Sequence, residues 1–200
     1  MHPLIGIIAL GGKSERMGTD KSMLQYHGKA QWQYVFDLLL NLCDAVVVSC
    51  NRSQESNFPS GIPVLIDAPE FENNGPIAAL LTATKKFPDA SFLLIGCDYP
   101  FLKLDELKLL VQSRNESVNG LAFYNEAVKV YEPLLAIYEQ PVLNKLQVNF
   151  AAGKLSLQHF LIEINALKII PKNKTSIRSI DTKNELLNAK EKLRKLNSKN

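Results

Sequence analysis

Three cationic side chains lie in a glycine-rich stretch near the start of the chain, residues 10–21, which read LGGKSERMGTDK. Glycines let backbone N–H groups approach anionic oxygens closely, and cationic side chains neutralise the charge that develops when a phosphoryl group is attacked. The stretch therefore predicts a loop that binds a polyphosphate. Gly11 and Gly12 are the expected backbone contacts, and Lys21 and Arg16 are the expected catalytic cations.

Two familiar nucleotide-binding motifs do not fit this loop. A Walker A motif would need a glycine where Ile7 stands. The dinucleotide pattern G-x-G-x-x-G is also missing, because Gly11 and Gly12 are adjacent and the next glycine is Gly18. The loop therefore indicates a nucleotide site of another kind.

Polar side chains also follow the later predicted strands of the first half, and they include Ser49, Asn51, Asp67 and Asp98. Ligands in open α/β sheets bind beyond the carboxyl ends of the strands, so we expect these residues at one crevice with the loop. Asp98 is the best candidate ligand for Mg²⁺, since a carboxylate beside a polyphosphate can hold that cation. A role in a turn or at a helix start is open for both aspartates.

Short apolar runs alternate with segments of helical period through the first half of the chain. The predicted strands are 4–10, 45–50, 63–66 and 92–95, and the predicted helices are 31–42, 76–86 and 104–112. The strands are apolar throughout rather than alternating, which is typical of parallel strands covered on both faces. The fold class is therefore α/β, with a Rossmann-like, doubly wound, mostly parallel sheet and helices on both faces.

The second half departs from this strict alternation. Strands are predicted at 120–124, 128–138, 167–170 and 177–180, and helices at 142–151, 155–164 and from Thr182 onwards. Because the first two of these strands are joined by a turn, we expect the sheet to be mixed in this half. A chain of 200 residues without a linker suits one domain, and we expect disorder in the last few residues.

Composition limits the classes of partner. The formal charge is +3, and the cationic excess lies mostly in the last residues, interleaved with Glu185 and Glu191, which indicates a solvated helix rather than a nucleic-acid surface. The three cysteines lack C-x-x-C spacing and indicate reduced core thiols. The apolar start is too short for a signal peptide, and no apolar run is long enough to span a membrane. We therefore expect a cytoplasmic protein without nucleic-acid or membrane partners.

The loop and the strand-end residues together resemble those of a known family. Residues 9–21, ALGGKSERMGTDK, are similar to the pattern L-A-G-G-x-S-x-R-M-G-x-D-K of the molybdenum cofactor guanylyltransferases, the MobA family of nucleotidyltransferases. The resemblance covers nearly the whole chain. It continues through residues 28–29, Trp32, 51–52, Asp67, 75–78, 97–100, 132–134, Ala136, Tyr138 and 180–182.

The resemblance implies a nucleotide-diphospho-sugar transferase fold and a single nucleotidyltransferase domain over 1–200, with a nucleotide-binding half at 1–100 and an acceptor-binding half at 101–196. It implies transfer of GMP from GTP to molybdenum-loaded molybdopterin, with release of pyrophosphate and with Mg²⁺ as cofactor. GTP and molybdopterin would be the substrates, with transient contact to proteins that mature molybdoenzymes. By the same resemblance, Ala9, Leu10 and Gly11 lie along the nucleotide, Lys21 on the phosphates, Asp67 on the nucleoside side and Asp98 on Mg²⁺.

The sequence departs from the family pattern at three places. The usual Leu-Ala is replaced by Ala9-Leu10, Ser49 stands where the family often has asparagine, and Asp181 stands where it commonly has the second asparagine of Asn-x-Asn-Thr. We hypothesise that Asp181 is a second metal ligand, with a role at the start of the last helix as the alternative. For the function, the alternatives are a cytidylyltransferase, a sugar-phosphate nucleotidylyltransferase, and a non-catalytic protein that binds a nucleotide or cofactor.

Overall fold

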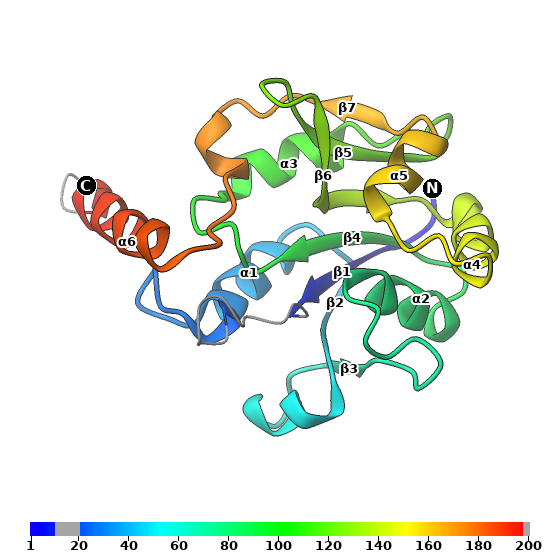
Figure 1. The fold of residues 1–200 in the computed structure, drawn as a ribbon, viewed down its shortest axis with the longest axis horizontal. Coiled ribbons are helices and arrows are strands. Elements are labelled where there is room, and N and C mark those ends of the chain that lie inside the picture. Colours follow the sequence, from blue (N-terminus) through cyan, green and yellow to red (C-terminus); the bar gives the residue numbers. More distant parts are fainter. Residues whose placement is uncertain (11–20, 198–200) are drawn as a thin grey trace.

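The computed structural model describes residues 1–10 and 21–197, so Gly11, Gly12 and Arg16 lie outside the described residues. Its centre is a seven-stranded sheet in the order β3-β2-β1-β4-β6-β5-β7, with helices on both sides (Figure 1). The strands are β1 Leu4–Ala9, β2 Ala45–Cys50, β3 Val64–Ile66, β4 Ser91–Gly96, β5 Gly120–Asn125, β6 Val130–Tyr138 and β7 Leu167–Ile169.

The described residues contain six α-helices, of which α6 lies to one side of the sheet and packs on a separate apolar cluster (Figure 1). They are α1 Gln31–Leu39, α2 Pro76–Lys86, α3 Leu104–Gln112, α4 Leu143–Ala151, α5 Leu157–Glu163 and α6 Lys183–Asn197. Buried side chains of α2, α4 and α5 pack on one face of the sheet, and those of α1 and α3 pack on the other. No helix within residues 1–10 and 21–197 has the length and apolarity needed to cross a bilayer.

The strand directions confirm the expected doubly wound, mostly parallel sheet that is mixed in its second half. β1 is parallel to β2 and β4, β3 is parallel to β2, and β7 is parallel to β5, whereas β6 runs antiparallel to both of its neighbours. All six residues of β1 are buried, as expected for a central parallel strand. Because β6 runs the other way, it begins at the edge where the parallel strands end.

The prediction of a strand at 177–180 is wrong. Residues Lys174–Ile177 form the 3₁₀-helix η5, which begins where the Asn173 side chain accepts a hydrogen bond from the Thr175 N–H at 2.9 Å. Ile177 and Ile180 are both buried, but in different apolar clusters. Their spacing therefore reflects two packing sites on either side of a turn rather than one strand.

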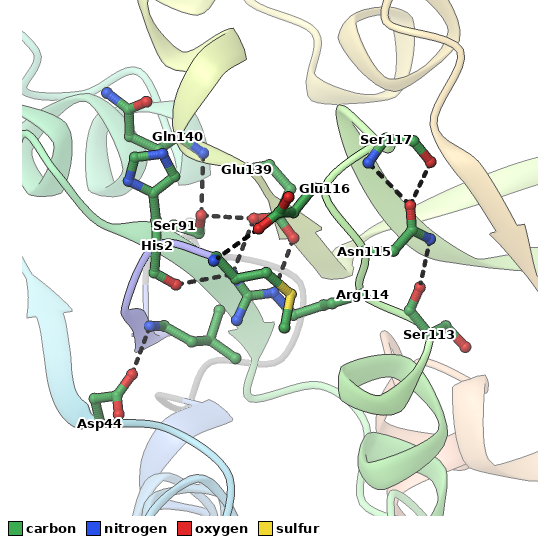
Figure 2. A network of polar contacts seen from close by, with 12 residues as sticks. His2, Asp44, Ser91, Ser113, Arg114, Asn115, Glu116, Ser117, Glu139 and Gln140 are labelled. Atoms are coloured by element: carbon green, nitrogen blue, oxygen red, sulfur yellow. Dashed lines mark hydrogen bonds and ion pairs between the residues drawn. The ribbon is translucent and has the colours of Figure 1, made fainter.

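Buried polar contacts close the amino edge of the sheet, at the starts of the parallel strands (Figure 2). Arg114 pairs with Glu139 through Nε–Oε1 and Nη2–Oε2 distances of 2.8 and 2.9 Å, and each side chain is only 8% exposed. Ser91 Oγ donates to the same carboxylate at 2.6 Å and accepts from the Gln140 N–H at 3.0 Å. Arg114 also donates to the His2 carbonyl at 3.2 Å. This network ties the start of β4 to the end of β6 and to the N-terminal segment.

Candidate active site

A cavity of about 300 Å³ lies beyond the carboxyl ends of β1, β2 and β3. It is lined by Ala9, Ser49, Cys50, Asn51, Gln54, Asp67, Asn73, Gly75, Pro76 and Ala79. Four residues that the sequence predicts to bind the nucleotide, Ala9, Ser49, Asn51 and Asp67, thus share one cavity. The other lining residues include Gln54, Asn73 and Ala79, which sequence reasoning missed. The size of the cavity is at the lower end of the range for small-molecule sites.

Ser49 orients the Asp67 carboxylate in this cavity. The Ser49 hydroxyl is buried and donates to Asp67 Oδ1 at 3.0 Å, while the Asp67 N–H donates to the Cys50 carbonyl at 3.1 Å. Burial raises the pKa of the Asp67 carboxyl above its ordinary value, and the hydrogen bond from Ser49 opposes this rise. Ser49, which departs from the family pattern, therefore orients the carboxylate of Asp67, the residue predicted to bind the nucleoside.

Asn51 and the start of α2 form two other walls of the cavity. Asn51 Oδ1 accepts hydrogen bonds from the Gln54 N–H at 3.1 Å and from Ser53 Oγ at 2.7 Å, which begins the 3₁₀-helix η3 over Arg52–Asn57. No residue that the structure describes accepts a hydrogen bond from Asn51 Nδ2. That amide is therefore available to a ligand.

The turn before α2 directs the positive end of the helix dipole at the cavity. Asn73 and Gly75 have φ of 63° and 66°, a left-handed backbone that glycine adopts readily and asparagine tolerates. Pro76 then occupies the first helical position, as the sequence predicts. The helix N-terminus lining a cavity favours an anionic or polar ligand there.

Asp98, the candidate metal ligand, lies two residues beyond the end of β4. Its Oδ1 is buried and has no hydrogen-bond partner among the residues that the structure describes. Burial raises the pKa of the carboxyl from 3.8 to about 6, although the Lys21 ammonium lowers it. Gly96 makes room for this group, since a Cβ at that position would lie 2.7 Å from Asp98 Oδ1. A buried oxygen without a partner is costly, and a cation would supply the missing interaction.

Lys21 and Asp181 meet beside Asp98, although they are 160 positions apart in the chain. Lys21 Nζ donates to Asp181 Oδ1 at 2.6 Å, and the Ile180 N–H donates to the Asp98 carbonyl at 2.9 Å. The charge of Asp181 raises the pKa of Asp98, after the larger effects of burial and of Lys21, so the three charges interact. The structure therefore brings together the predicted phosphate-binding lysine and both candidate metal ligands.

Thr182 and Glu185, rather than the Asp181 side chain, cap the start of α6. The Glu185 carboxylate accepts hydrogen bonds from the N–H groups of Asp181 and Thr182, each at 3.1 Å. Thr182 Oγ1 in turn accepts from the Glu185 N–H at 3.3 Å, which completes a capping box. The Asp181 carboxylate instead accepts from Lys21 and, at 3.0 Å, from Ser179 Oγ.

Glu132 is a further carboxylate near Asp98, and the sequence analysis assigned it no role. It accepts a hydrogen bond from Tyr99 Oη at 3.3 Å. Burial raises the pKa of its carboxyl, and the nearby charge of Asp98 contributes to that rise. Its position follows from the antiparallel register, in which Ile95 of β4 pairs with Leu135, so that Glu132 lies level with the residues after β4. Only the direction of β6, which the apolar pattern does not show, could have indicated this contact.

Leu10 is placed differently from the other predicted nucleotide residues. Its side chain is buried among the apolar residues under α1, and its N–H donates to the Ser49 carbonyl at 3.2 Å. Ala9, one position earlier, is the part of β1 that reaches the cavity. Contact of Leu10 with a nucleotide stays a prediction, as do the roles of Gly11, Gly12 and Arg16.

Comparison with known proteins places this site in a family. The family model described as a MobA-like NTP transferase domain matches residues 6–165. The chain belongs to this family. The molybdenum cofactor guanylyltransferase of Serratia proteamaculans is 31% identical over 172 residues, which cover 84% of this chain and 85% of that protein. A bifunctional molybdenum cofactor biosynthesis protein of Synechocystis is 37% identical over 118 residues, which cover 58% of this chain and 33% of that longer protein.

The solved structures agree with the MobA-like assignment at the level of fold. Molybdopterin-guanine dinucleotide biosynthesis protein A from Archaeoglobus fulgidus aligns with a TM-score of 0.75 and 20% identity over 96% of this chain and 99% of that one. The predicted nucleotide-diphospho-sugar transferase fold is confirmed. MobA-like transferases of this kind generally use a divalent metal. The unpartnered Asp98 oxygen fits such a metal, although the described residues include no group of three or more acidic, histidine or cysteine side chains that could hold one alone.

Proposed function

We propose that the protein transfers GMP from GTP to molybdenum-loaded molybdopterin and releases pyrophosphate. The observation that supports this best is the buried, unpartnered oxygen of Asp98 beside the Lys21–Asp181 pair. Ala9, which lines the nucleotide cavity, pairs in the sheet with Gly96, two residues before Asp98. The cavity and the charged cluster are therefore neighbours along one edge, as a nucleoside and its triphosphate require.

In this proposal the guanosine occupies the cavity and the triphosphate extends towards Lys21. An oxygen of the pterin phosphate forms a bond to the α-phosphorus of GTP, and the bond from that phosphorus to the bridging oxygen breaks. Pyrophosphate leaves with the electron pair of that bond. Asp67 holds the nucleoside, while Lys21 and Arg16 orient the phosphates and stabilise the negative charge of the transition state. Catalysis then results from positioning of the two substrates and electrostatic stabilisation of the transition state, without a covalent enzyme intermediate.

Asp98 would hold the divalent metal, with Asp181 as a second ligand, and we propose Mg²⁺. When bound, this cation supplies charge neutralisation for the triphosphate. Lys21 would then exchange its contact with Asp181 for a phosphate oxygen. The N-terminal half, 1–100, binds the nucleotide and the half at 101–196 binds the acceptor within one domain. A cytoplasmic location and transient contact with proteins that mature molybdoenzymes are also part of this proposal.

The test is turnover of radiolabelled GTP, with CTP in parallel, by the purified chain with Mg²⁺ and molybdenum-loaded molybdopterin. Acid hydrolysis of the product identifies the nucleotide that was transferred. Release of GMP from the GTP reaction alone is the expected result. Release of CMP would overturn the proposal in favour of a cytidylyltransferase. Release of neither nucleotide would leave a sugar-phosphate nucleotidylyltransferase or a binding protein.

A further inference from the structure

Glu106 is a buried carboxylate on α3 that the proposed GMP transfer does not use. It lies in the first turn of the helix and is 5% exposed. Its Oε2 accepts a hydrogen bond from the Lys172 N–H at 3.0 Å, and its Oε1 accepts from the Asn173 N–H at 2.8 Å and from Ser176 Oγ at 3.3 Å. Hydrogen bonds to a carboxylate are roughly twice as strong as those between neutral groups. One side chain of α3 therefore holds a stretch of chain that lies 66–70 positions later.

The stretch that Glu106 holds has little regular structure of its own. β7 ends at Ile169 and α6 begins at Lys183, and the described residues between them form one regular element, the four-residue 3₁₀-helix η5. Such short helices are weak by themselves, because their hydrogen-bond geometry is poor. Ile177 at the end of η5 is buried in the apolar cluster to which α1 and α3 contribute. The path of this stretch therefore depends on contacts with the rest of the fold, and Glu106 supplies three polar ones.

The same stretch leads directly into the charged cluster at the candidate active site (Figure 1). The Ile180 N–H donates to the Asp98 carbonyl at 2.9 Å, and Asp181 Oδ1 accepts from Lys21 Nζ at 2.6 Å. Four residues lie between Ser176, the last group that Glu106 contacts, and Asp181. Because so short a connection leaves little slack, a shift of the anchored stretch would move Asp181 as well.

The neighbouring acid on the same turn of α3 faces solvent instead. Asp105 has a side-chain exposure of 83%, and its Oδ1 lies 3.9 Å from Lys108 Nζ. Both acids are in the first turn of the helix, where the helix dipole favours a negative charge. The dipole therefore explains neither the burial of Glu106 nor its three contacts with the stretch before α6.

We propose that Glu106 is a positioning residue for the GMP transfer. It holds residues 172–176 on α3, and this fixes Asp181 beside Lys21 and Asp98, where the metal would be bound. Glu106 touches neither substrate in this role and acts through Asp181. The role rests on the proposed function, but the hydrogen bonds on which it depends form in the chain without substrate.

The first test is hydrogen exchange of the Ile180 amide, measured by NMR on the full chain without metal or nucleotide. Glu106→Gln keeps the size of the side chain but turns one acceptor oxygen into a donor, which then faces the donors of the stretch. Exchange should become about ten-fold faster, because losing a hydrogen bond to a carboxylate makes local opening easier. Ser176→Ala, which removes only the longest of the three contacts, should have a smaller effect in the same direction.

Two controls separate this role from general effects on charge and stability. Asp105→Asn removes the same charge from the same helix turn and should leave the exchange at Ile180 unchanged. Ser91→Ala removes a buried contact at the amino edge of the sheet. It should lower the free energy of unfolding and leave the exchange at Ile180 unchanged. Unchanged exchange in Glu106→Gln, or an equal acceleration in Ser91→Ala, would overturn the proposal.

A double-mutant cycle tests whether Glu106 acts through Asp181. Glu106→Gln should raise the Mg²⁺ concentration needed for half-maximal GMP transfer by about ten-fold, as changes to outer-shell contacts at metal sites do. In the Asp181→Asn background it should raise that concentration no further, since the carboxylate that it positions is gone. Additive effects would overturn the proposal in favour of a purely structural role. The exchange measurement needs no turnover, so failure of the GMP transfer assay and failure of this proposal are distinguishable.

Discussion

Buried charges are paired differently at the amino and carboxyl edges of the sheet. At the amino edge, Arg114 and Glu139 are both 8% exposed, and the carboxylate also accepts a hydrogen bond from Ser91. At the carboxyl edge, Asp98 is buried, and no described residue donates a hydrogen bond to its Oδ1. The Lys21–Asp181 ion pair beside it is partly open to solvent. The buried carboxylate at the amino edge is fully paired, whereas the buried carboxylate at the other edge has one oxygen without a hydrogen-bond partner among the described residues.

This difference separates polar groups that hold the fold from those that act on a substrate. A buried ion pair with good geometry contributes little net stability, but removing one partner is strongly destabilising. A buried carboxylate without partners lowers stability while the site is empty and attracts a cation. Substitutions at the two edges should therefore have opposite effects on stability and on activity.

The largest expected effect is on activity, in the variant Asp98→Asn. Loss of the proposed metal ligand should slow GMP transfer by about a hundred- to a thousand-fold, comparable to the loss of one strong electrostatic contact in a transition state. The free energy of unfolding should rise or stay unchanged, since an amide is cheaper to bury than a carboxylate with one unpartnered oxygen. Rate assays and urea unfolding measure the two quantities. A clear loss of stability in this variant would show that Asp98 is structural.

At the other edge, Arg114→Ala should lower the free energy of unfolding by about 3–5 kcal/mol, because it leaves the Glu139 carboxylate buried without its ion-pair partner. The rate of GMP transfer per folded molecule should not change. The double variant Arg114→Met with Glu139→Gln is the control, and it should recover much of the loss since no buried charge remains. A loss of activity in Arg114→Ala, measured under conditions where the variant is fully folded, would contradict a purely structural role of the ion pair.

The pH dependence of stability sharpens the comparison at Asp98. Its pKa in the folded protein is about 6, above the ordinary 3.8, so the folded state favours the protonated form. The stabilising contribution is fully present below about pH 4 and is lost as the pH rises through 6. The wild type should therefore lose up to about 3 kcal/mol relative to Asp98→Asn over this range, from the size of the shift. Urea unfolding of both proteins from pH 4 to 7 measures the difference. If the free energies of unfolding of the two proteins change with pH in parallel, the raised pKa of Asp98 is refuted.

The smallest effect on stability is expected for Asp181→Asn. The Lys21–Asp181 pair is partly exposed, with side-chain exposures of 23% and 53%, so its loss should cost less than about 1 kcal/mol. If Asp181 is a metal ligand, the Mg²⁺ concentration needed for half-maximal activity should rise. Glu191→Gln on the exposed face of α6 is the control, because it removes only the exposed ion pair with Lys195 and should leave that Mg²⁺ concentration unchanged. Unchanged Mg²⁺ dependence in Asp181→Asn would remove the metal-ligand hypothesis.

The first half of the fold was predictable because each of its strands is a short apolar run bounded by turns or helices. Runs such as Ala45–Cys50 carry their own signal of burial on both faces. The second half was harder, and Ile177 and Ile180 illustrate why. Apolar residues near each other in sequence predicted one short strand, but here they enter different clusters on either side of a turn.

At the site, the sequence could predict which residues follow the strands but not how they meet. Asp67 and Asp98 were identified because the carboxyl ends of parallel strands share one edge. The contact between Lys21 and Asp181 joins the two ends of the chain, and no local pattern specifies it. The pairing of Arg114 with Glu139 was also missed, since charged residues in a sequence are most often exposed and burial depends on tertiary packing.

The distance along the chain between Lys21 and Asp181 has a consequence for synthesis. All seven strands that the structure describes precede Asp181, so these strands leave the ribosome before the partner of Lys21 does. Leu24 and Tyr26, which follow the loop, likewise lack their packing partners on α6 until then. The strands of the sheet are therefore synthesised before the charged cluster at the proposed reaction centre can be assembled.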